Sequence, residues 1–132
     1  MNLLDEMFAT AINAQRAAYA PYSKFPVGAA IVGTSGRIFA GCNVENAAYP
    51  AGTCAEAGAI AAMIAAGDTK IRELLVLGNG PGLVTPCGAC RQRIREFAGP
   101  DAIIHIAGPD GIRARFTLSN LLPHAFGPDN LG

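Results

Sequence analysis

Apolar and polar residues divide the chain into short segments of different periodicity. Near the start, apolar side chains recur every three or four positions, which predicts an amphipathic helix over residues 3–19. Residues 27–32 are apolar or small throughout, as in a buried strand, and residues 37–43 follow a turn at residues 34–36. This arrangement predicts a β-hairpin after the first helix.

The rest of the chain alternates helical and extended patterns. The patterns predict helices over residues 54–66 and 87–97, strands over 73–78, 102–107 and 113–117, and a last helical turn at 119–122. The order helix, strand, strand, helix, strand, helix, strand, strand is that of an α/β protein. We therefore expect a single domain over residues 1–132, with a mixed five-stranded sheet sandwiched between helices in three layers.

The charge balance restricts the kinds of partner. Ten basic and ten acidic residues cancel, and only 15% of the chain is charged while 51% is apolar. Neutralisation of phosphates supplies most of the affinity for a polynucleotide, so nucleic acid is not an expected partner. The low charge also indicates apolar surface that self-association would cover.

Neither a signal peptide nor a membrane span is expected. Asp5 and Glu6 interrupt the start of the chain, and no apolar run approaches the roughly eighteen residues of a span. The alanine-rich residues 57–66 fit a packed helix instead. We expect a cytoplasmic protein, in which the four cysteines are reduced or bind metal rather than forming disulfides.

Three cysteines and one glutamate carry the clearest chemical signal. Cys54 precedes Glu56 by two residues, and Cys87 and Cys90 form a Pro-Cys-x-x-Cys segment. Both segments start predicted helices, where free backbone N–H groups favour thiolates. Structural zinc sites have four protein ligands, whereas catalytic sites have three and leave the fourth position to water. Three cysteines beside an acid therefore favour a hydrolytic zinc site.

A structural zinc site with a fourth protein ligand is the alternative interpretation. The candidates for that ligand are Cys42, His105 and His124. Cys42 lies on a predicted strand, where a buried apolar thiol is the commoner role. His105 lies among isoleucines, and His124 lies in the tail.

Five segments carry a resemblance to a known family: residues 22–28, 43–47, 54–56, 86–92 and 121–128. With all five in order, the chain closely resembles the small, homotetrameric cytidine deaminases of nucleoside salvage. Its Cys-x-Glu and Pro-Cys-x-x-Cys pair is the signature of zinc-dependent base deaminases. The resemblance implies a cytidine-deaminase-like three-layer α/β/α sandwich.

The resemblance also implies the chemistry of the site. Cys54, Cys87 and Cys90 would hold one zinc ion per subunit, with water as its fourth ligand. Zinc can lower the pKa of a bound water from about 15.7 to roughly 7. Glu56 would move protons from this water to N3 of cytosine and to the departing amine. Cytidine and 2′-deoxycytidine would thus yield uridine and 2′-deoxyuridine with release of ammonia, in pyrimidine salvage.

Other residues match the family's substrate contacts. Asn43 and Glu45 correspond to the residues that bind the ribose 3′-hydroxyl, and an amide with a carboxylate can serve both functions of a hydroxyl. Phe25 matches an aromatic that packs on the pyrimidine. The backbone of Ala55 would hold the polar edge of the base, and the carbonyl of Thr85 would face the leaving amine.

Three further positions imply shared active sites. In the family, the counterparts of Ala47, Tyr49 and Phe126 reach the site from neighbouring subunits, with Phe126 covering the base. A phenylalanine in a tail rich in proline and glycine needs such an apolar destination, because disorder is the usual state of such a tail. The resemblance therefore implies a homotetramer.

One departure concerns the charge around the metal. Many members of the family carry arginine directly after the catalytic glutamate, and this chain has Ala57 there. Three thiolates around Zn²⁺ leave a net charge of −1. We expect helix N-terminal amides, together with Arg91, to compensate this charge.

Three other functions compete with cytidine deamination. Deaminases of another aminopyrimidine nucleoside, such as blasticidin S, share the zinc motifs, although residues 43–46 favour an ordinary ribose. Editing of a polynucleotide is disfavoured by the near-zero net charge. A non-catalytic zinc protein would require a fully protein-ligated ion.

Overall fold

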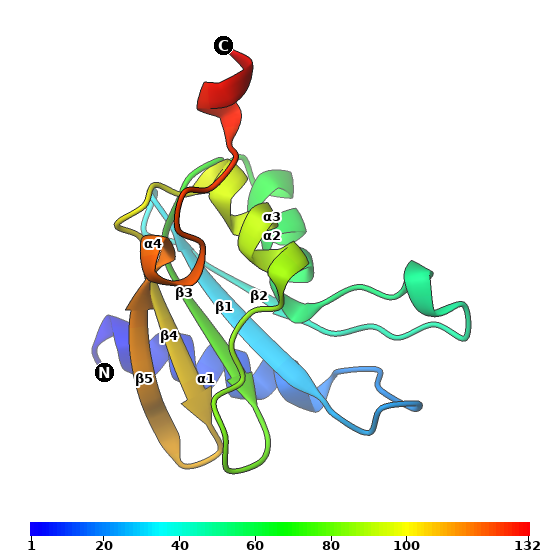
Figure 1. Ribbon diagram of the computed structural model, residues 1–132. Coiled ribbons are helices and arrows are strands. Elements are labelled where there is room, and N and C mark those ends of the chain that lie inside the picture. The colour runs from blue at the N-terminus through cyan, green and yellow to red at the C-terminus, as the bar shows by residue number, and fades with distance from the viewer.

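The computed structural model describes all residues from Met1 to Gly132, and a mixed five-stranded sheet forms its centre (Figure 1). The strands are β1 (Val27–Gly33), β2 (Ile38–Cys42), β3 (Ile71–Gly78), β4 (Ile103–Gly108) and β5 (Gly111–Thr117). Their order across the sheet is β2-β1-β3-β4-β5. This confirms the α/β class and the five-stranded mixed sheet expected from the sequence.

Strand direction decides where a site can form. β1 pairs antiparallel with both β2 and β3, and β3 pairs parallel with β4. β2, β3 and β4 therefore run in the same direction, and their carboxyl ends lie at one edge of the sheet. In open α/β sheets this edge is where ligands usually bind.

Helices cover both faces of the sheet. They are α1 (Leu3–Arg16), α2 (Ala55–Ala65), α3 (Gly88–Phe97) and the short α4 (Leu118–Leu121), with 3₁₀ turns η1 (Tyr49–Ala51) and η2 (Pro128–Leu131). Connections between parallel strands are right-handed. The β2–α2–β3 and β3–α3–β4 connections step the same way across the sheet, so α2 and α3 lie together on one face and α1 on the other (Figure 1).

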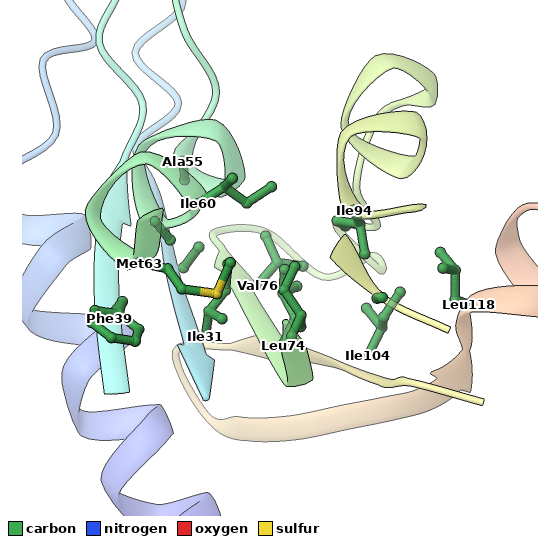
Figure 2. Packing of buried hydrophobic residues seen from close by; sticks show 14 of the residues in the cluster. Ile31, Phe39, Ala55, Ile60, Met63, Leu74, Val76, Ile94, Ile104 and Leu118 are labelled. Atoms are coloured by element: carbon green, nitrogen blue, oxygen red, sulfur yellow. The ribbon is translucent and has the colours of Figure 1, made fainter. Parts of the chain in front are cut away.

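The larger part of the core lies between the sheet and the pair α2 and α3. Figure 2 shows side chains from both helices meeting those of the strands in this layer. The fully or nearly fully buried members include Met63 from α2, Ile94 from α3, and Ile31, Leu74 and Ile104 from the strands. Burying a large aliphatic side chain of this kind contributes about 1.5–3 kcal/mol, so this layer fixes both helices on the sheet.

A smaller core lies under α1 on the opposite face. Met7 and Ala11 of α1 pack against Val32, Leu75 and Leu77 of the strands, and all five are fully buried. The side chains of successive strand residues point to opposite faces. β1 and β3 therefore contribute to both cores, which explains why they are almost continuously apolar.

Two glycines allow the helices to approach the sheet closely. A Cβ atom at Gly28 would lie 2.0 Å from the carbonyl oxygen of Ala11 in α1. On the other face, a Cβ at Gly41 would lie 2.3 Å from the carbonyl oxygen of Ala55 and from the backbone nitrogen of Ala59 in α2. Gly41 therefore determines how closely the first turn of α2 approaches β2.

The predicted elements are all present, but several ends differ. The first helix ends at Arg16 rather than residue 19, because the backbone of Tyr19 bonds instead to Asn43 and Glu45. The second and third helices begin one residue late, since Cys54 and Cys87 occupy extended N-cap positions. Other strand ends move by one or two residues, as where β5 starts at Gly111 rather than residue 113. The tail, expected to be irregular, contains η2.

None of the helices combines the length and apolar character that crossing a membrane would require.

We predict that Gly41→Ala destabilises the protein by about 1–3 kcal/mol, the usual cost of overpacking a well-packed contact. The added methyl group meets backbone atoms of α2, which cannot rotate away. Urea unfolding monitored by circular dichroism measures the change. Gly99→Ala is the matched control, because nothing lies within 4 Å of a Cβ built at Gly99. Equal stability of the two variants would contradict the close approach.

Candidate active site

The three cysteines come together where α2 and α3 begin. Cys54 is the N-cap residue of α2 and Cys87 that of α3, while Cys90 lies within the first turn of α3. Because both helices follow strands that end at the same edge, their N-termini are neighbours. Cys87 and Cys90 follow Cys54 by 33 and 36 positions in the chain. In the structure the three thiols nevertheless form one cluster.

The geometry of the three sulfur atoms fits a single zinc ion. All three lie within 4.8 Å of one another, and the Sγ atoms of Cys54 and Cys87 are 3.9 Å apart. With Zn–S bonds of about 2.3 Å, two sulfurs on a tetrahedral ion lie about 3.8 Å apart. The donor set and its spacing therefore suit zinc.

No fourth protein ligand joins this group. Cys54, Cys87 and Cys90 form the cluster without any further cysteine, histidine, aspartate or glutamate within the same distance. His105 lies in β4, where its Nε2 is 2.9 Å from Oε1 of Glu73 and its Nδ1 is buried without a partner. The arrangement is therefore that of a site with three protein ligands.

Burial and hydrogen bonding act differently on the three thiols. Burial raises the pKa of the Cys90 thiol far above its ordinary value, and the nearby charge of Glu56 adds to this. Burial also raises the pKa of Cys54. At Cys87 burial acts in the same direction, but hydrogen bonds from the Cys90 backbone N–H and from the other thiols outweigh it and lower the pKa. Without a cation, three thiolates would repel one another at this place.

Glu56 is the only buried acidic residue, with 4% of its surface exposed. It lies in the first turn of α2, two residues after Cys54. Burial raises the pKa of its carboxyl group, because the charged form loses hydration. A carboxyl group with a raised pKa can both accept and return a proton near neutral pH.

Glu56 and two of the cysteines line a cavity of about 610 Å³. This volume lies in the range of small-molecule pockets. Besides Cys54, Glu56 and Cys87, its lining includes Tyr22, Ser23, Phe25, Val27, Asn43, Val44, Glu45, Asn46, Tyr49, Gly52, Thr53, Ala55, Val76, Val84 and Thr85. The cavity is therefore predominantly apolar, with a few polar groups and one buried acid.

The Glu45 carboxylate is held in place by the loop between α1 and β1. Its Oε1 accepts hydrogen bonds from the backbone N–H groups of Tyr22 at 2.9 Å and Ser23 at 3.1 Å. Its Oε2 accepts a further bond from the Ser23 hydroxyl. These bonds, the Ser23 hydroxyl first, lower the pKa of Glu45. Glu45 is thus an oriented, ionised acceptor in the lining of the cavity.

Asn43 is fixed in a similar way. Its Oδ1 accepts from the Val27 backbone N–H at 2.9 Å, and its Nδ2 donates to the carbonyl oxygen of Phe25 at 3.0 Å. An amide carries two donor hydrogens and two acceptor lone pairs. Asn43 therefore keeps one donor and one acceptor for a ligand, beside Glu45 on the same wall.

The structure places the remaining predicted contacts in two groups. Phe25, Ala55 and Tyr49 line the cavity of their own chain, and Tyr49 packs near Tyr22 with ring centroids 6.0 Å apart. Ala47 and Phe126 do not line this cavity. Phe126 is 58% exposed in the tail, which projects from the body of the molecule in Figure 1. That Tyr49 also reaches the site of a neighbouring subunit stays a prediction.

The expectation for Arg91 was wrong. Its guanidinium bonds to the carbonyl oxygens of Pro86 and Leu121, both at 2.8 Å, and to the Thr85 hydroxyl at 3.2 Å. It therefore fixes the loop before α3 rather than compensating the thiols. Arg93, which the sequence reasoning missed, donates from Nη1 to Cys90 Sγ at 3.4 Å. Its spacing of three residues from Cys90 on a helix was the signal available in the sequence.

Comparison with known proteins agrees with this geometry. Residues 1–106 match the family described as "Cytidine and deoxycytidylate deaminase zinc-binding region". The cytidine deaminase of Sporosarcina psychrophila is 39% identical over 128 residues, which cover 97% of this chain and 94% of that protein.

Solved structures show the same similarity. The crystal structure of cytidine deaminase from Burkholderia pseudomallei superposes with a TM-score of 0.87 at 39% identity, covering 96% of this chain and 100% of that one. For the Mycobacterium tuberculosis enzyme the TM-score is 0.82 at 35% identity, with coverages of 96% and 99%. The chain therefore belongs to the zinc-binding cytidine and deoxycytidylate deaminase family.

Proposed function

We propose that the protein catalyses the hydrolytic deamination of cytidine and 2′-deoxycytidine to uridine and 2′-deoxyuridine. The observation that carries this proposal is a buried Glu56 that opens on the same cavity as the three-cysteine cluster. An acid beside a metal site with three protein ligands is the arrangement needed to activate a water molecule for attack on a nucleobase. The relatives' common name, cytidine deaminase, supports the choice of substrate.

Cys54, Cys87 and Cys90 would hold zinc, which would supply a water molecule that reacts at neutral pH. Glu56 would accept a proton from this water and give it to N3 of the cytosine ring, while the water oxygen bonds to C4. Glu56 would then take the second proton from the hydroxyl group now on C4 and deliver it to the amine as the C4–N4 bond breaks. Water and cytidine would thus give uridine and ammonia. Burial raises the pKa of the Glu56 carboxyl group, which favours its role as a carrier that accepts a proton and returns it.

The cavity walls would orient the base and the sugar separately. Ala55, Thr85 and Phe25 line the same cavity as Glu56. The Ala55 backbone and the Thr85 carbonyl would meet the polar edge of the base, while Phe25 would pack on its face. Asn43 and Glu45 would bind the 3′-hydroxyl, the amide as donor and the carboxylate as acceptor. Each already has its orientation fixed by bonds to the loop around Phe25.

We also propose a homotetramer with shared active sites, acting in pyrimidine salvage in the cytoplasm. Large apolar side chains on two projecting segments support this assembly. Tyr49 is 76% exposed in the β2–α2 connection, and Phe126 is 58% exposed in the tail. Tyrosine and phenylalanine are enriched at protein–protein interfaces relative to the rest of the surface. Ala47 and Phe126 would then complete a neighbour's cavity.

We predict that Glu56→Gln lowers kcat for cytidine by at least 10²–10⁴-fold, the usual range for loss of general acid–base help. The amide keeps the shape of the buried side chain but cannot exchange protons. An ultraviolet assay of cytidine consumption measures the rate, and metal analysis verifies the zinc content. Glu73→Gln, which removes a carboxylate that bonds to His105, is the matched control. A zinc-loaded Glu56→Gln enzyme with more than a tenth of the activity would contradict the proposal.

We predict that Ser23→Ala raises the KM for cytidine by roughly threefold to tenfold, in the range of one lost hydrogen bond of about 0.5–1.5 kcal/mol, because two backbone N–H groups still hold Glu45. The Ser23 hydroxyl orients Glu45 and lowers its pKa, so this pKa rises in the variant. As the pH falls, KM should therefore begin to rise at a higher pH than in the wild type. Steady-state kinetics and an NMR titration of Glu45 test both effects. Ser35→Ala removes a similar bond to Asp68 and should change neither quantity.

We predict that two inactive variants restore activity when they assemble together. In a mixed tetramer, the Phe126→Ala chain provides Glu56 while the Glu56→Gln chain provides Phe126. Some sites then contain both groups only if they are shared. Co-expression followed by the cytidine assay measures the recovery, and light scattering measures the mass against 13.6 kDa per chain. Mixed tetramers without any recovered activity would contradict shared sites.

A further inference from the structure

The metal centre collects more negative charge than its ion neutralises. Three thiolates around Zn²⁺ leave a net charge of −1, and the carboxyl group of Glu56 lies beside them. Cys90 is fully buried and Glu56 nearly so. A buried charge is costly unless another group pairs with it. A cation close to the sulfurs would therefore favour the zinc-bound form.

Helix α3 carries three arginines at alternate positions, and their contacts separate their roles. Arg91 is fully engaged with the backbone of residues 86 and 121 and with Thr85. Arg95 lies 3.5 Å from Asp129 in the tail. Only Arg93 contacts a thiol, through the 3.4 Å bond from Nη1 to Cys90 Sγ.

Helix α2, which lies beside α3, carries no charged side chain after Glu56. Ala57, directly after Glu56 in α2, lines a surface groove between α2 and α3. Arg93 lines the same groove from α3, together with Gln92 and Glu96. The small side chain of Ala57 leaves this groove open. A longer side chain at position 57 of α2 would extend into the same groove that Arg93 lines from α3.

We propose that Arg93 is a positioning residue of the zinc site, which holds the Cys90 thiolate and compensates its charge in place of a cation at position 57. The guanidinium donates to a sulfur lone pair that is not used by the metal. This fixes the orientation of Cys90 and strengthens the hold of the cluster on zinc. The inference rests on the zinc site of the proposed function and does not depend on the identity of the substrate.

Zinc affinity tests this role directly. Loss of a group that orients a metal ligand typically weakens metal binding by 10–100-fold. Because Arg93 is largely exposed, we expect Arg93→Met to weaken zinc binding about tenfold, the lower end of that range. Competition with a chromogenic zinc chelator measures the dissociation constant. Arg72→Met removes the same charge from an exposed position on β3 and should leave the affinity unchanged.

Two further variants distinguish a specific role from a structural one. Arg93→Lys keeps the charge with a single point donor and should fall between wild type and Arg93→Met. In the double variant Arg93→Met, Ala57→Arg, the new guanidinium enters the same groove from α2 and should restore at least half of the lost affinity on a logarithmic scale. If Arg93→Met does not fold, the comparison of Arg93→Lys with wild type decides, with a loss of at least twofold expected.

The proposal is overturned if folded Arg93→Met binds zinc within twofold of wild type, or if Arg72→Met loses as much affinity. It is also overturned if Ala57→Arg restores nothing. The affinities are measured without substrate, so a protein that shows the expected order of zinc binding but does not deaminate cytidine would refute the proposed function alone.

Discussion

Everything at the active site depends on two crossover connections having the same hand and the same direction. They bring the first turns of α2 and α3 to one edge of the sheet, on one face. Only then can Cys54 meet Cys87 and Cys90, which lie 33 and 36 positions further along the chain. The sheet is thus the template for the metal centre, and the two-sided core keeps that template rigid.

Two opposing effects act on the acidic groups of the site: burial removes their hydration, and neighbouring donors and cations stabilise their negative charge. Removing acidic groups from water raises the pKa of Glu56 and Cys90, which makes the carboxyl group useful in proton transfer but opposes the thiolate form that metal binding requires. Helix N-termini and a guanidinium offset that opposition at the sulfurs and leave Glu56 largely uncompensated. Burial can therefore raise the pKa of Glu56 without preventing metal binding by the thiols, because the Arg93 guanidinium and the Cys90 backbone N–H donate to sulfurs rather than to the carboxyl group.

The sequence predicted the order of the elements and the metal-binding residues because both follow from local rules. Hydrophobic period identifies helices and strands, and cysteine spacing of three residues identifies a shared helical turn. The roles of Arg91 and Arg93 were not predictable in the same way. The spacing of three residues places Arg93 on the same helical face as Cys90. It does not show that Arg91 instead bonds to the carbonyl oxygens of Pro86 and Leu121, because Leu121 lies 30 positions further along the chain. The hydrogen bond from the Ser23 hydroxyl to Glu45 joins residues that are 22 positions apart. Ser23 lies in a loop without hydrophobic periodicity, so no sequence pattern predicts this bond.

Helix α3 links the carboxyl-terminal tail to the metal-binding cysteines. Beyond its cysteines, Gln92 donates to the carbonyl oxygen of Phe126 at 2.8 Å, and Arg95 approaches Asp129. The last residues of the chain are therefore attached to the helix that supplies two of the three sulfurs, whereas Met1 is exposed at the start of α1 on the other face of the sheet. For anyone preparing the protein, an affinity tag or fusion partner belongs at the amino terminus, where its bulk is kept away from the chemistry.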